Sequence, residues 1–233
     1  MMTDTRARSY DEMVDALAAE GLPALQDSLA GLAPQDWERP TMLQPPQAER
    51  PPWTVLQLAA HFDVFMGLTM GLVAEPMVAQ PVVDRASFYI SVSDRSKVSP
   101  VIYQYIVDHA QGHTPATIRD QVNETFKQAL EAIRTTPPDT IGPGFFGPMR
   151  LDEFVATRLV EVQVHGMDLT DALGLAPMPM PGVTTMAAEV LDEVLARRAV
   201  PGRPADLEAD ELGFLRAAAG RGGHPDPRLP ILG

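Results

Sequence analysis

One stretch decides the fold expected of this chain: residues 149–173 read MRLDEFVATRLVEVQVHGMDLTDAL. We predict a single long helix here, which ends before Gly174 at the position where helices commonly place a glycine. One face of this helix runs from Phe154 to Ala172 in steps of three and four. The centre of that face is polar and consists of Arg158, Glu161, His165 and Asp168. Because burying an unpaired carboxylate costs several kcal/mol, such a face needs a compensating partner.

Glu161 and His165 have the spacing of a metal-binding pair. Residues four apart on a helix lie on one face, with Cβ atoms about 5–6 Å apart, so both side chains can reach one ion. His61 offers a third donor from another predicted helix, on the same face as Leu58 and Phe65. A divalent cation held by His61, Glu161 and His165 would compensate the buried carboxylate. We therefore expect one metal per chain, with zinc as the best candidate and iron, nickel or cobalt as alternatives.

Simpler interpretations exist for the same residues. Glu161 with Arg158 could form an ordinary surface ion pair, His61 could be a core histidine, and the polar face could be a buried ion-pair network without metal. His109 and His113 form a rival pair at the same spacing, but Gly112 and Thr114-Pro115 break the helix between them, which favours an exposed helix end. His224 lies in a segment rich in glycine and proline and is expected at the surface.

Other segments also predict helices. Ser9 with Glu12 and Thr54 with Gln57 have the spacing of capping boxes. Ser99-Pro100 and Thr114-Pro115 place proline at the first helical position. The expected helices cover residues 10–33 with a kink near Leu22, and residues 54–74, 99–109, 115–134, 183–198 and 207–219. Residues 87–92 could be a short extended stretch, residues 139–148 are expected to be a loop, and the end of the chain is expected to be irregular. The pattern indicates an all-α helical bundle.

Composition restricts the classes of function. The chain of 233 residues has no cysteine, which excludes disulfides, cysteine nucleophiles and thiolate ligands and is consistent with a reducing cytoplasm. A formal net charge of −13 argues against nucleic acid as a partner. We expect no membrane span and, from the polar first residues, no signal peptide. The oligomeric state cannot be read from the sequence.

Three motifs resemble the mycothiol-dependent maleylpyruvate isomerase family, within the DinB-like superfamily of metal-binding helical bundles. The first runs from Asp36-Trp37 to Pro40-Thr41 and looks like the family's turn after its first helix. The second, WTVLQLAAH at residues 53–61, resembles a Trp-x-Val-x-x-x-x-x-His signature. The third, RLVEVQVHGMDL at residues 158–169, resembles an Arg-x-x-Glu-x-x-x-His-x-x-Asp-Leu signature.

This resemblance implies a DinB-like four-helix bundle over residues 1–182, with zinc held at the positions of His61, Glu161 and His165 and with mycothiol as cosubstrate. Residues 183–233 are then expected to form a short helical extension packed on the bundle, with no full second domain. The family's isomerase carries a further α/β domain that helps close its active site, and only about 50 residues follow Pro181 here. For that reason the sequence favours a zinc-dependent S-transferase over an isomerase of the maleylpyruvate type.

The proposed chemistry needs no catalytic side chain beyond the metal-bound thiolate or water. Three protein ligands leave one zinc position open, and a coordinating thiol is deprotonated there. Arg158 could bind a carboxylate of the thiol or of the electrophile, or pair only with Glu161. Asp168 could orient a ligand histidine, or belong to a solvated helix end. A thiol-independent metal hydrolase and a non-catalytic metal-binding bundle remain alternatives, and the expected partners are a small thiol and a small electrophile.

Overall fold

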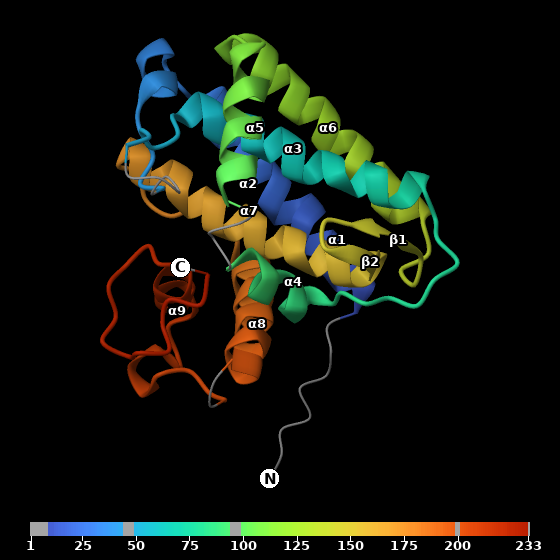
Figure 1. Cartoon of the computed structure of the whole chain (residues 1–233). Helices are drawn as coiled ribbons and strands as arrows, with labels where there is room; N and C mark the ends of the chain where they lie inside the picture. The colour runs from blue at the N-terminus through green and yellow to red at the C-terminus, as the bar shows by residue number, and fades with distance from the viewer. Residues whose placement is uncertain (1–8, 44–48, 94–98, 199–200, 233) are drawn as a thin grey trace.

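Four helical segments form a bundle in the computed structural model, which describes residues 9–43, 49–93, 99–198 and 201–232 (Figure 1). The first segment is α1 (Tyr10–Ala16), which continues through a π-helical turn (Leu17–Gly21) into α2 (Leu22–Ala30). The others are α3 (Val55–Ala74), α6 (Pro115–Thr135) and α7 (Leu151–Leu173). α3 packs against α6 and α7, and the first segment closes the ring by packing against the same two helices. The predicted all-α helical bundle is confirmed.

The helix starts follow the predicted caps. The Ser9 hydroxyl accepts from the backbone N–H of Glu12, and the Thr54 hydroxyl accepts from that of Gln57. Each cap satisfies one of the amide groups that a helix leaves unpaired in its first turn. The expected irregularity near Leu22 is the π-helical turn. Pro23, which has no backbone N–H to donate, follows this turn, in the first turn of α2.

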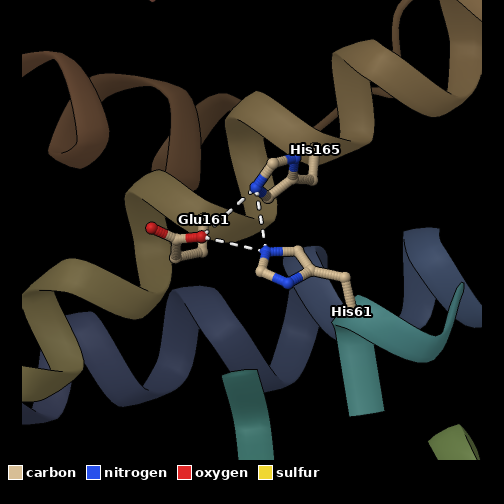
Figure 2. A group of neighbouring side chains, drawn as sticks. All are labelled: His61, Glu161 and His165. Carbon is tan, nitrogen blue, oxygen red and sulfur yellow. Dashed lines mark hydrogen bonds and ion pairs between the residues drawn. The ribbon is translucent and has the colours of Figure 1, made fainter. Parts of the chain in front are cut away.

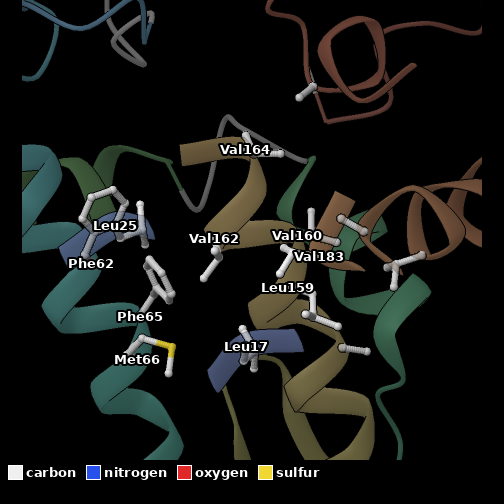
Figure 3. Close-up of a cluster of buried hydrophobic side chains, with 14 of the residues drawn as sticks. Leu17, Leu25, Phe62, Phe65, Met66, Leu159, Val160, Val162, Val164 and Val183 are labelled. Atoms are coloured by element: carbon white, nitrogen blue, oxygen red, sulfur yellow. The ribbon is translucent and has the colours of Figure 1, made fainter. Parts of the chain in front are cut away.

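Apolar side chains from all four segments fill the centre of the bundle. Phe62 and Met66 of α3 lie toward Leu17 and Leu25 of the first segment and Val162 of α7, and all of them are buried (Figure 3). By length and composition α3 would also suit a membrane crossing. Its buried face, however, packs against α6 and α7, which is the position of a core helix.

The interpretation of residues 87–92 as extended is wrong, because they lie in α4 (Arg85–Val92). The Asp84 carboxylate accepts the backbone N–H of Ser87 at 2.9 Å and so caps this short helix. Ala86 and Tyr89, three residues apart, are buried on one side of it. The following helix, α5 (Ser99–Gln111), confirms the predicted helix and extends it by two residues.

The loop expected at residues 139–148 is replaced in part by a hairpin of β1 (Ile141–Gly144) and β2 (Gly147–Arg150). Pro143 pairs with Pro148, which a two-stranded sheet tolerates because both of its strands are edges. A Cβ at Gly142 would collide with the backbone of Leu72, so glycine lets the hairpin lie against the end of α3. The turn of the hairpin presents Phe145 and Phe146.

The C-terminal part adds α8 (Pro181–Arg198), a 3-10 turn (Ala205–Leu207) and α9 (Glu211–Ala218). α8 packs against α7, and α9 packs against α8. Arg216 of α9 also forms an ion pair with Asp171 of α7 at 2.6 Å. The helices expected at 183–198 and 207–219 are present with shifted ends, while the division at residue 182 stays a prediction.

Replacing Thr54 tests the cap that begins α3. We expect Thr54→Ala to lower the free energy of unfolding by about 1 kcal/mol, because the hydroxyl that accepts the Gln57 N–H is lost. Thr54→Ser keeps the hydroxyl and should be close to the wild type. The measurement is urea unfolding followed by circular dichroism, and equal losses in the two variants would contradict the capping argument.

Candidate metal centre

Three side chains from two helices meet inside the bundle, as Figure 2 shows: His61 from α3, and Glu161 and His165 from α7. The Nε2 atoms of the two imidazoles are 3.1 Å apart. The Oε2 atom of Glu161 lies 3.5 Å from Nε2 of His61 and 3.3 Å from Nε2 of His165. Among the residues that the structure describes, this is the one group of three histidine or acidic side chains with all ligand atoms within 4.8 Å of one another.

The spacing of the three donor atoms fits a tetrahedral metal site. Bonds of about 2.0–2.1 Å to a tetrahedral zinc ion place neighbouring ligand atoms about 3.4 Å apart. The three observed separations, 3.1, 3.3 and 3.5 Å, bracket that value. Two imidazole nitrogens and one carboxylate oxygen are also a donor set typical of catalytic zinc, with the fourth position left for an exogenous ligand.

The protein environment holds two of the three candidate ligands, His61 and Glu161, in the charge states that a cation requires. Burial lowers the pKa of His61 to about 4, so its imidazole is neutral at pH 7. For Glu161, burial acts to raise the pKa, but hydrogen bonds with His165 and His61 outweigh it and hold the pKa well below its usual range. The neutral imidazole of His61 and the ionised carboxylate of Glu161 therefore face the same point. For His165, burial acts to lower the pKa, but hydrogen bonds with Asp168 and Glu161 outweigh it and raise the pKa.

Glu161 has a second partner that fixes its orientation. The hydroxyl of Tyr89, on α4, lies 3.1 Å from Oε1 of Glu161 and 2.9 Å from the backbone oxygen of Thr157, so it can donate to either. Tyr89 lies on the side of Oε1, and the other oxygen, Oε2, is directed at the two imidazoles. The sequence did not indicate Tyr89, since it lies in the segment interpreted as extended.

His165 is supported by a chain of two further residues. Oδ2 of Asp168 lies 2.8 Å from Nδ1 of His165, and Arg221 donates to both carboxylate oxygens of Asp168, at 2.9 and 2.8 Å. Burial acts to raise the pKa of Asp168, but the charge and hydrogen bonds of Arg221 lower it to about 2. An ionised Asp168 keeps the proton of His165 on Nδ1 and leaves Nε2 free to bind a metal. A solvated helix end does not describe Asp168, whose side chain is fully buried.

Arg158 is buried and contacts aromatic rings. Nη1 donates to the backbone oxygen of Phe65 at 2.6 Å, and Nε and Nη2 donate to the hydroxyl of Thr157. Its guanidinium lies 4.3 Å from the ring centroid of Phe154. The alternative of a surface ion pair with Glu161 is therefore wrong, because Arg158 is only 1% exposed. Its role toward a carboxylate substrate stays a prediction.

His61 differs from His165 in its surroundings. The rings of Trp53 and Phe65 lie 5.2 and 5.5 Å from its imidazole, between centroids. Its buried Nδ1 has no hydrogen-bond partner among the described residues. Aromatic packing, rather than a carboxylate, therefore sets the orientation of this ligand.

The other histidines lie elsewhere. Nε2 of His109 is 2.8 Å from Oδ2 of Asp63, and His113 packs edge-on against His109 just after α5 ends. His224, which was expected at the surface, lies 3.2 Å from an oxygen of Asp206, and its side chain is 11% exposed. None of the three lines the pocket beside the metal ligands.

A pocket of about 450 Å³ opens next to the three ligands, which form part of its lining. Its remaining walls are mostly apolar and aromatic, and most of them come from α3, α4, α5, α7 and the hairpin turn. Phe145 and Phe146 both line it, and Phe145 is 52% exposed at the opening. A small molecule in this pocket would lie directly beside a bound metal.

Comparison with known proteins shows the family of this chain. The family model described as the mycothiol maleylpyruvate isomerase N-terminal domain matches residues 18–170, which include all three ligands. The chain belongs to this family. The three motifs that suggested the resemblance, at residues 36–41, 53–61 and 158–169, all lie within the match.

Solved structures give a consistent fold. The crystal structures of the mycothiol-dependent maleylpyruvate isomerase and of a point mutant of it each match with a TM-score of 0.61 and 16% sequence identity. Each match covers 95% of this chain and 93% of the isomerase chain. At this identity the likeness shows the fold alone. No curated protein matches the sequence.

Arg221 is the site residue that sequence reasoning had least chance of finding. It follows α9 in a segment that was expected to be irregular, about 50 positions after Asp168, and no spacing links the two. Its only local signal is a basic residue among glycines. The contact depends on how the C-terminal segment folds back onto α7.

Metal analysis tests the site directly. We expect purified protein to contain close to one zinc per chain, and His165→Ala to lose most of it, because two protein donors hold zinc far less well than three. His113→Ala is the matched control and should keep its metal. Wild-type protein without stoichiometric metal, or a His165→Ala variant with unchanged content, would contradict the assignment.

Replacing Asp168 tests the support of His165. We expect Asp168→Asn to weaken zinc binding by about 10- to 100-fold, because the charge that fixes the His165 tautomer and pairs with Arg221 is removed. Asp171 lies on the same helix as Asp168 and forms an ion pair with Arg216 of α9. Asp171→Asn removes that pair and should leave zinc affinity unchanged. Competition with a chromogenic chelator measures both, and equal affinities in the two variants would show that Asp168 does not support the site.

Proposed function

We propose that this protein is a metal-dependent isomerase that uses a low-molecular-weight thiol, mycothiol, to convert a cis double bond next to a carbonyl group into the trans form. The observation that supports this best is a two-histidine, one-carboxylate site that faces a pocket in a member of the mycothiol maleylpyruvate isomerase family. Family membership supports an enzyme and a small thiol. The metal, zinc as first choice, is inferred from the donor geometry.

The residues of the chain have separate tasks in this proposal. His61, Glu161 and His165 would hold the ion, which when bound lowers the pKa of a thiol at its open position and so supplies a thiolate at neutral pH. Tyr89 and Asp168 keep Glu161 and His165 in the orientation that leaves this position open. The buried walls of the pocket exclude water, which would compete with the thiol.

The reaction would proceed by addition and elimination. The thiolate sulfur forms a bond to one alkene carbon, and the π electron pair moves onto the neighbouring carbonyl as an enolate. The carbon–carbon link is then a single bond and can rotate. When the enolate re-forms the double bond, the carbon–sulfur bond breaks and the thiolate is released unchanged. Arg158 is proposed to bind a carboxylate of the substrate during these steps.

An S-transferase would share the first step and differ in the second. Protonation of the enolate carbon would leave a stable thioether and consume the thiol. The sequence favoured this outcome because a closing domain was expected to be missing. The structural match spans 95% of this chain and 93% of the isomerase chain, so the two chains do not differ by a domain. The preference for a transferase, which was based on a missing domain, therefore loses its basis. A cytoplasmic location and the absence of nucleic-acid partners remain predictions.

Turnover assays separate these outcomes. With zinc-loaded protein and mycothiol, we expect a cis alkene next to a carbonyl group, such as a maleate monoester, to be isomerised without loss of thiol, and no turnover when mycothiol is omitted. Glu161→Gln should lose at least 100-fold in kcat/KM, because it removes the anionic ligand. Consumption of one thiol per product would identify a transferase, thiol-independent turnover a hydrolase, and either result would overturn the isomerase proposal.

A further inference from the structure

The pocket points to a particular class of electrophile, and this inference rests on the proposed function. We propose that the substrate is an activated alkene that carries an apolar alkyl or aromatic group and at most one carboxylate. The apolar group would occupy the pocket while the double bond lies beside the metal ligands. A small molecule with an ionised group at each end would not match these walls.

The walls next to the ligands offer mainly apolar contact. Phe65 and Val64 come from α3, Phe88 and Val92 from α4, and Ile102 and Ile106 from α5. Tyr103 also lines the pocket, but its hydroxyl donates to the backbone oxygen of Pro51 at 2.7 Å. Tyr103 therefore presents its apolar ring to a ligand. A second carboxylate placed against these side chains would lose its hydration without gaining hydrogen bonds.

The cations of the pocket are largely engaged. Among the described lining residues, the permanently charged ones are Arg158 and Arg221. Arg221 donates two hydrogen bonds to Asp168 and a third to the backbone oxygen of Ala219. Arg158 donates to Phe65 and Thr157 and lies among aromatic rings, with part of its fork still available. Arg158 can therefore bind one carboxylate, whereas the described lining residues offer no second available cation.

The opening of the pocket is also apolar. Leu68, Val101, Tyr105 and Phe145 all line the pocket, and they are 43%, 65%, 57% and 52% exposed. Large apolar side chains that remain exposed around one cavity are typical of a binding site for an apolar ligand. They extend the apolar wall outward, so a substituent longer than the cavity would still make contact.

Binding of unreactive analogues tests the proposal without requiring turnover. The probes are succinate and its monomethyl, monobutyl and monobenzyl esters, measured by calorimetry on zinc-loaded protein. We expect affinity to rise on the order of threefold for each methylene that enters the pocket, with the benzyl ester among the tightest and succinate the weakest. Affinities that do not change along the series, or tightest binding by succinate, would overturn the proposal.

A charge placed at the opening locates the binding site. Val101→Lys should weaken monobutyl succinate binding at least fivefold relative to succinate, because it interrupts the apolar wall. Val78→Lys, at a fully exposed valine outside the pocket lining, is the matched control and should have no effect. Equal effects of the two variants, with circular dichroism showing both folded, would show that the esters bind elsewhere.

The corresponding maleate monoesters separate this inference from the proposed function. If the saturated esters follow the expected series but no maleate ester is isomerised with mycothiol, the proposed function fails and the substrate class stands. If maleate itself is isomerised fastest and the esters bind no better than succinate, the function stands and the substrate class is overturned.

Discussion

The placement of Glu161, an ionised carboxylate, inside a helical bundle is the constraint on which the rest of the structure depends. α7 directs Arg158, Glu161, His165 and Asp168 inward, where apolar side chains would otherwise lie. Two of these charges have partners within the protein: Arg158 donates to the backbone oxygen of Phe65, and Asp168 accepts from Arg221. Glu161 instead faces two imidazoles at 3.3 and 3.5 Å, a geometry that a cation satisfies better than a hydrogen bond does. The cap at Thr54 begins α3 so that His61 meets this carboxylate.

The C-terminal segment is more closely tied to the site than the family boundary suggests. The family match ends at residue 170, yet Arg221, beyond α9, holds Asp168 and thereby His165. Arg216 and α8 attach the same segment to α7. The metal centre therefore lies between the bundle and its extension, and α4 contributes Tyr89 from a third direction. Donor side chains fixed from several sides would hold a cation next to the pocket that they help to line.

Local signals explain which parts of this arrangement the sequence could predict. The caps at Ser9, Thr54 and Thr114 and the spacing of Glu161 and His165 depend on residues within one helix, so the long helices and the ligand pair could be inferred directly. His61 required a match to a second motif. α4 and the hairpin were missed because one lacks clear periodicity and the other consists largely of glycine and proline. Tyr89 and Arg221 reach the site only through tertiary packing, which no spacing in the sequence encodes.

The most direct test of the central claim is X-ray absorption at the zinc edge, on protein with and without added mycothiol. Three protein ligands and one open position predict light nitrogen and oxygen scatterers at about 2.0–2.2 Å in the free protein, and one additional sulfur scatterer at about 2.3 Å when the thiol is present. A zinc environment that stays free of sulfur at saturating thiol would contradict the account, because the three ligands would then hold a metal that does not bind the cosubstrate.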